Sequence, residues 1–169
     1  MSDADVIVQH VGLQRLDAEK FKPYGMVLSE DALSFPEFDP EEGRIAFEMF
    51  KMRRSRFTRE SIGFHFSYTQ PIIVLKGKIA LIVAPPPRDP KATLETAEVD
   101  YDRVAAFEIQ GGEGIVLGRG VWHDFVGLDD QTTILHLVRR LTSERFSSPA
   151  ESINMRERDN HVIVLEPAA

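Results

Sequence analysis

The sequence contains no cysteine, which excludes disulfide bonds, thiolate-ligated zinc and a cysteine nucleophile. It also lacks an N-terminal apolar signal stretch and any apolar run of membrane-spanning length. Positive charge is scarce, since 20 Lys and Arg stand against 27 Asp and Glu for a formal net charge of −7. The one arginine cluster, at 53–59, is flanked by Glu48 and Glu60. We therefore expect a cytoplasmic protein with neither a nucleic-acid nor a membrane partner.

A chain of 169 residues with 43% hydrophobic residues can bury the core of one domain, and we expect a single domain over 1–169. The segment Leu16–Gly25 is typical of a short helix with Asp17 as its N-cap. Segments 29–43 and 85–91 are predicted to be loops, and Val74–Lys78 a hairpin turn. Strand-like segments lie at 44–52, 63–66, 71–75, 78–84, 105–110, 114–117, 122–126, 132–140 and 161–167. Many short strands between regular turns indicate a sandwich or barrel.

Two segments about fifty residues apart, Gly63–Gly77 and Gly112–Gly127, each carry one histidine and end in glycine. In the first, His65 is followed by Gln70. In the second, a turn at 118–120 precedes His123. This spacing is similar to the two motifs of the cupin barrel in degraded form. The resemblance implies an all-β, cupin-type double-stranded β-helix, a jelly-roll barrel with a short N-terminal helix. In that fold His65, Gln70 and His123 would converge in one cavity.

The departures from the cupin motifs concern metal binding. Gly63 stands where the motif has its first histidine, and Gln70 where it has glutamate. Two imidazoles and a neutral amide offer no negative charge to offset a dication. We therefore expect a cavity with no required metal or cofactor, and weak divalent metal binding at His65, Gln70 and His123 is the alternative.

Three longer segments, Leu16–Leu28, His65–Pro86 and Gly111–Leu128, resemble the ureidoglycolate lyase family, a cupin-like group of carbon–nitrogen lyases. The resemblance implies an enzyme of allantoin and purine catabolism that releases urea from ureidoglycolate and leaves glyoxylate. The positions that match are His65, Gln70, Arg119, Trp122, His123 and Arg140. The positions that differ are Gly63, Leu117, Gly118 and Asp124.

The matching residues suggest roles in that reaction. His65 and His123 are the candidate acid–base pair, in an order that stays open, because imidazole exchanges protons near neutral pH. Gln70 would hold the ureido group. Arg140, then Arg119, would clamp the carboxylate of a small acid substrate. Trp122 is either a cavity wall or a core residue.

Some choices stay open at the level of sequence. Arg139 and Arg140 alternate across a strand, so only one of them can face inward. Lys51 and Arg53 are alternative clamps. A metal-dependent cupin, such as a dioxygenase or isomerase, and a non-catalytic module that binds a small carboxylate are the alternative functions. The apolar strand 161–167 would need a partner for its edge, and pairing across a two-fold axis predicts a homodimer.

Overall fold

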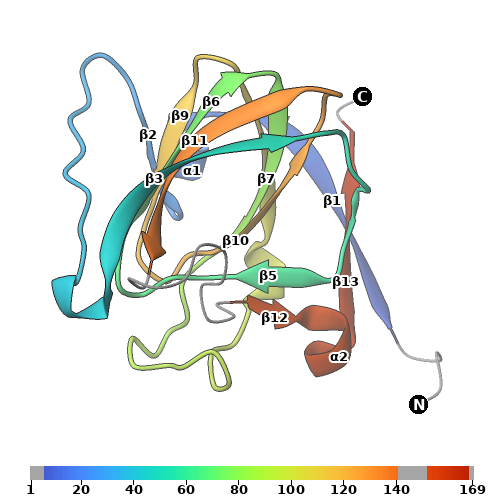
Figure 1. Ribbon diagram of the computed structural model, residues 1–169. Helices are drawn as coiled ribbons and strands as arrows, with labels where there is room; N and C mark the ends of the chain where they lie inside the picture. The colour runs from blue at the N-terminus through green and yellow to red at the C-terminus, as the bar shows by residue number, and fades with distance from the viewer. Residues whose placement is uncertain (1–5, 141–151, 168–169) are drawn as a thin grey trace.

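The protein is built from two β-sheets that face each other (Figure 1). The computed structural model describes residues 6–140 and 152–167, with the side chains of Glu42 and Arg140 outside that description. The eight-stranded sheet has the order β12-β5-β10-β7-β8-β1-β13-β4 and the five-stranded sheet the order β2-β9-β6-β11-β3. The mostly-β, cupin-like fold that the motifs predict is confirmed.

Glycine and proline in the sequence predict many of the strand bounds closely. The larger sheet contains β1 (Ile7–Arg15), β4 (Thr58–Arg59), β5 (Ser61–Gly63), β7 (Lys78–Ala84), β8 (Ala105–Gln110), β10 (Trp122–Gly127), β12 (Ser152–Asn154) and β13 (His161–Glu166). The smaller sheet contains β2 (Gly25–Val27), β3 (Arg44–Met52), β6 (Gln70–Lys76), β9 (Gly114–Leu117) and β11 (Thr132–Arg140). The expected bounds of β3, β7, β8, β9 and β11 agree with the structure to the residue.

Consecutive strands alternate between the two sheets, as they do in a double-stranded β-helix. From β5 to β11, only β7 and β8 are consecutive strands of one sheet. The predicted hairpin at Val74–Lys78 is therefore wrong. β6 pairs with β9 and β11, whereas β7 pairs with β8 and β10. Gly77, at φ 76°, turns the chain from one sheet to the other instead of pairing its neighbours.

The strand β7 illustrates how the sheets form two cores. Its alternate residues Ile79, Leu81 and Val83 point between the sheets and pack with apolar residues of β6, β9 and β11. The other set, including Ala80 and Ile82, points to the opposite face of the eight-stranded sheet. That face is covered by the segment 92–104 and by α2 (Met155–Asp159). Every residue of β7 after Lys78 is buried, which explains its unbroken apolar sequence.

The helical segments are short. The helix α1 (Ala18–Phe21) begins where expected, with Asp17 accepting a hydrogen bond from the Lys20 amide at 2.9 Å. Single turns of 3-10 helix, η2 (Pro40–Glu42) and η3 (Tyr101–Arg103), interrupt the loops. In the described ranges, no helix is long and apolar enough to span a membrane.

The C-terminal strand β13 does not have the open edge that the sequence suggested. It pairs in parallel with β1 and antiparallel with β4 (Figure 1). The reason for expecting a homodimer through 161–167 is therefore removed. The sequence pattern missed β1, because its exposed and buried positions do not alternate and Gly12 lies in its middle. It also missed the short elements β2, β4, β12 and α2.

Candidate functional site

Two histidines from separate motifs meet at one end of the barrel. His123 lies in β10 opposite Val83, whose side chain points between the sheets. His65 follows β5, and its carbonyl accepts a hydrogen bond from the Gly120 amide at 2.6 Å. The two imidazole rings lie 5.1 Å apart between centroids. This is close enough for both rings to contact one small molecule.

The hydrogen bond of His123 assigns its tautomer. Its Nδ1 lies 3.0 Å from the carbonyl oxygen of Val121. A carbonyl only accepts, so in the neutral ring Nδ1 carries the proton and Nε2 keeps a lone pair. The imidazole is thus oriented by the backbone, with Nε2 as the atom that can take up a proton.

Tyr68 is a residue of this site that the sequence analysis did not single out. Its ring stacks on His65, with centroids 4.6 Å apart and an interplanar angle of 22°. The side chain is buried. The sequence could have indicated Tyr68 by its position two residues before Gln70, because alternate residues of an extended chain share a face. Stacking fixes the plane of the His65 ring, and the phenol adds a further polar group.

Gln70 begins β6 and points inward. Its register partner is Leu117 of β9, a residue of the core between the sheets. The side chain is only 4% exposed, and its Oε1 has no hydrogen-bond partner among the residues that the structure describes. A buried acceptor without a donor is costly, by about 1–3 kcal/mol. The amide oxygen is thus suited to receive an N–H from a bound molecule.

A cavity of about 740 Å³ opens beside His65. One wall is apolar and comes partly from the proline-rich loop that follows β7, which hangs below the barrel in Figure 1. The charged or ionisable residues in its wall are Asp39, His65, Arg119 and Arg139. Of the predicted site residues, His65 and Arg119 line this cavity, whereas Gln70 and His123 do not.

Arg119 is held by acidic neighbours. Its Nη1 donates to Asp39 at 2.8 Å and to the Phe66 carbonyl at 3.2 Å, and its Nε lies 2.9 Å from the carboxylate of Glu37. The hydrogen bond to Asp39 is the main cause that raises the pKa of Arg119. Because two carboxylates already balance its charge, Arg119 fits a role in ordering the cavity wall better than the predicted carboxylate clamp.

The strand β11 supplies the other arginine of the cavity. Arg139 lines the wall and is 9% exposed. The backbone of Arg140 pairs with Arg44 of β3, but its side chain lies outside the described residues. The prediction that Arg140 is the first clamp therefore stays a prediction, and Arg139 is the arginine of this pair seen in the cavity.

Trp122 does not face the histidines, and its assignment as a substrate-binding wall is corrected. It is fully buried on the opposite face of β10, where its ring packs against Phe64 at 4.3 Å between centroids. Its Nε1 donates to the Glu98 carbonyl at 3.1 Å. Successive residues of a strand point to opposite faces, so Trp122 and His123 cannot share a cavity. Of the two roles that the sequence left open, Trp122 is therefore a core residue.

Asp124 shares the face of Trp122. Its carboxylate pairs with Arg59 at 2.5 Å. Burial raises the pKa of Asp124, while the bond to Arg59 opposes that rise. The residue at this departure from the family pattern therefore belongs to a structural ion pair rather than to the cavity.

A second polar pair lies between the sheets. His136 of β11 is buried, and its Nε2 lies 3.0 Å from the Glu48 carboxylate of β3. The rings of Phe125 and His136 are 6.3 Å apart between centroids. Because Phe125 follows His123 by two residues on the same face of β10, His136 lies across the barrel from that face. The sequence analysis named Glu48 only as a flank of the arginine cluster and did not single out His136.

The residues present do not form a metal site of the cupin type. Gly63, which pairs with His123 across β5 and β10, stands where the motif has its first histidine. Two imidazoles and the Gln70 amide form a donor set without a carboxylate. Within residues 6–140 and 152–167, no group of three His, Cys, Asp or Glu side chains could hold a metal ion.

Neither a protein-family model nor a characterised protein matches the sequence. Several solved structures resemble the fold, three of which are an epimerase, an isomerase and a decarboxylase. A dTDP-4-dehydrorhamnose 3,5-epimerase from Elizabethkingia anophelis NUHP1 shares 13% identity at a TM-score of 0.42, covering 63% of this chain and 53% of the epimerase. A dTDP sugar isomerase from Desulfovibrio desulfuricans G20 shares 17% identity at 0.43, covering 76% of this chain and 71% of the isomerase.

The third is the formate complex of oxalate decarboxylase from Lactobacillus farciminis, with 12% identity and a TM-score of 0.43. That match covers 79% of this chain and 32% of the decarboxylase, so this chain corresponds to only about a third of that protein. Likenesses this remote say nothing of this chain's substrate.

Proposed function

We propose that the protein is an acid–base enzyme for a small carboxylate, and that it releases urea from ureidoglycolate to give glyoxylate. The observation that carries the proposal is the 5.1 Å approach of the His65 and His123 rings. Two imidazoles that can contact one ligand can divide the roles of base and acid. The substrate itself comes from the family resemblance of the sequence.

The reaction asks little of the protein beyond proton transfer. Ureidoglycolate is a carbinolamide, so a base removes its hydroxyl proton, the electron pair forms the aldehyde C=O, and the C–N bond breaks. An acid then protonates the urea nitrogen that leaves. The assigned tautomer of His123 supports Nε2 of this residue as the base, with His65 as the acid. The Gln70 Oε1 suits the N–H groups of the ureido moiety.

The carboxylate requires a cation. Arg139 is the candidate that we propose first, because it is a buried cation that lines the same cavity as His65. A guanidinium can hold a carboxylate through two parallel hydrogen bonds. This places the anionic end of the substrate toward the cavity wall and its carbinol carbon toward the histidines.

The test is release of urea and glyoxylate from ureidoglycolate by the purified chain, with and without added divalent metal. We expect turnover without metal, and a loss of at least about a hundredfold in kcat for His123→Gln, the range of one general acid–base group. His10→Gln is the matched control, since His10 is exposed and pairs with Glu166 at the surface. Equal activity of the His123 and His10 variants would contradict the proposal.

The same assay separates the alternative functions. Binding of ureidoglycolate or glyoxylate by calorimetry without any product would indicate a non-catalytic module for small acids. Turnover that appears only after metal is added would instead favour a metal-dependent cupin. The two outcomes are distinct, because the first leaves the histidine pair without a chemical role and the second gives it the role of a ligand set.

A further inference from the structure

An exposed apolar patch covers part of the outer face of the five-stranded sheet. Phe47 and Met49 of the edge strand β3 are 74% and 61% exposed, although both are large and apolar. Their register partners on β11, Leu137 and Leu135, lie on the same outward face. Leu75, the extra residue at the register shift between β6 and β11, is also exposed. Such a patch marks an interaction surface.

One end of this face is basic. Thr133 of β11 pairs with Lys51 of β3 on one side and with Lys76 of β6 on the other, so the three lie in a row across the strands. Together with Arg53 they line a hollow of about 620 Å³. Lys76 bonds the Gln131 amide oxygen, and in the described chain neither lysine nor Arg53 forms an ion pair.

The segment between β2 and β3, residues 28–43, carries the complementary chemistry. Figure 1 shows it as a long excursion away from the two sheets. Leu33 and Phe35 are each 83% exposed, the highest values among the large apolar residues. Glu30 and Asp31 stand beside them, and within the described ranges neither carboxylate has an ion-pair partner. We call residues 28–35 the arm.

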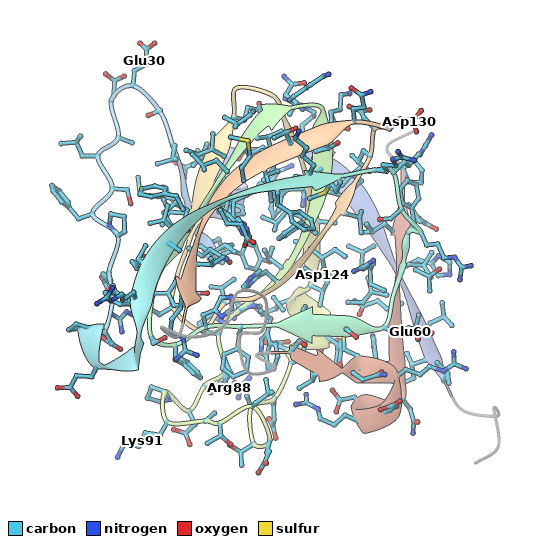
Figure 2. The ribbon with its side chains drawn as sticks, viewed as in Figure 1. Glu30, Glu60, Arg88, Lys91, Asp124 and Asp130 are labelled. Carbon is cyan, nitrogen blue, oxygen red and sulfur yellow. The ribbon has the colours of Figure 1, made fainter. Side chains whose placement is uncertain are left out.

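The arm cannot reach the basic hollow of its own chain. Figure 2 shows Glu30 at the tip of the arm and Asp130, which lines the hollow, at opposite sides of the molecule. The arm is apolar with acidic residues, and the outer face is apolar with a basic end, so the two are complementary. Within one copy of the chain, however, they lie apart. Two copies related by a two-fold axis can satisfy both arms and both faces at once.

We propose that two copies of this chain form a dimer in which the arm of each copy lies on the outer face of the other's five-stranded sheet. A standard interface buries about 800 Å² per partner. Aromatic side chains bury about 150–250 Å² each, so Phe35 and Phe47 with the aliphatic residues beside them supply most of that area.

The mass of the full chain in solution, by light scattering or sedimentation at micromolar concentration, tests the proposal. We expect twice the mass of one chain. Phe47→Asp with Met49→Asp should give a folded monomer, with folding checked by circular dichroism and thermal melting. Val8→Asp is the matched control, since Val8 is 52% exposed on β1 and should leave the dimer intact. A monomeric wild-type chain would overturn the proposal. The exposed apolar face would then have to bind a partner other than a second copy.

Charge reversal identifies the contact. Lys51→Glu with Arg53→Glu, and separately Glu30→Lys with Asp31→Lys, should each raise the dimer dissociation constant at least about tenfold at low salt. Mixing the two variants should restore association, because each arm then meets a face of opposite charge. A dimer that survives both reversals and the Phe47 and Met49 changes would be held elsewhere, and the arm-to-face contact would be wrong.

Discussion

At the residue scale, position within a strand decides which side chains can act together. His123 and Trp122 are neighbours in sequence but lie on opposite faces of β10, so His123 approaches the His65 ring and Trp122 packs in a core. The motif spacing predicted the histidines because spacing fixes register. It did not indicate the pairing of Glu48 with His136, since a cross-strand contact depends on which strands become neighbours. For Tyr68 the only signal was its spacing from Gln70.

The arginine assignment can be tested at this scale. If Arg139 clamps the substrate carboxylate, Arg139→Ala should lower kcat/KM for ureidoglycolate at least about tenfold, because a charge-assisted hydrogen bond is lost. Arg139→Lys keeps the charge but loses the planar fork, so its loss should be smaller. Arg88→Ala is the control, as Arg88 is exposed on the loop in Figure 2. A large effect of Arg140→Ala alone would restore the original choice of clamp.

The turn before His123 offers a stability test. Gly120 has φ 74°, and a Cβ on it would overlap the Phe66 ring. Gly120→Ala should therefore lower the free energy of unfolding by about 1–3 kcal/mol and reduce activity, because the Gly120 amide holds the His65 carbonyl. Denaturant unfolding measures the first effect.

Gly12→Ala is the matched control, since a Cβ at Gly12 meets nothing within 4 Å. Its unfolding free energy should stay within about 0.5 kcal/mol of the wild-type value. Equal stability of the two variants would show that the turn tolerates a side chain.

At the element scale, the sequence predicted strands well where both flanks carry glycine, proline or a turn, as in β7 and β8. The sequence did not predict strands that form because of their pairing partners and lack a local alternating pattern. β1 shows little alternation and is a strand because it lies between β8 and β13. The sequence also could not predict which strands pair with β6 and β7. A glycine turn has the same sequence pattern whether it joins two paired strands or connects two sheets.

The stability contributed by the junction of β1 and β13 should decrease at acidic pH. The His161 ring stacks on Tyr101 at 3.7 Å between centroids, and its Nε2 lies 2.8 Å from the Gln9 Oε1. Burial lowers the pKa of His161 below its ordinary 6.5, while Asp159 opposes the shift. The unfolded chain thus takes up a proton near pH 6.5 more readily than the folded one. The stability linked to His161 is present above that pH and is lost as pH falls through the lowered pKa.

We therefore expect the melting temperature to fall as the pH is lowered below 6.5, and to fall less steeply in His161→Gln. The comparison of the two slopes isolates this residue from the carboxylates that titrate at lower pH. Identical slopes in the wild type and His161→Gln would mean that the stacked ring is not coupled to folding.

At the scale of the whole molecule, stability should not depend on metal. The site offers two imidazoles and an amide, a neutral set that compensates none of a dication's charge. Treatment with a chelator should leave the melting temperature unchanged, and addition of divalent metal should not raise it. A large drop after chelation would show that metal binding contributes to folding and that the ligand set extends beyond the described residues.

The position of β13 has a consequence for how the protein is made. Among the described strands, β13 alone joins β4 to the sheet, and it also covers one side of β1. Because β13 follows the other described strands in the sequence, a chain still on the ribosome would carry β1 and β4 before their partner is made. The final sheet could close only after residue 166 has left the exit tunnel. Until then the apolar surface that Ile163 and Leu165 complete would remain open to chaperones.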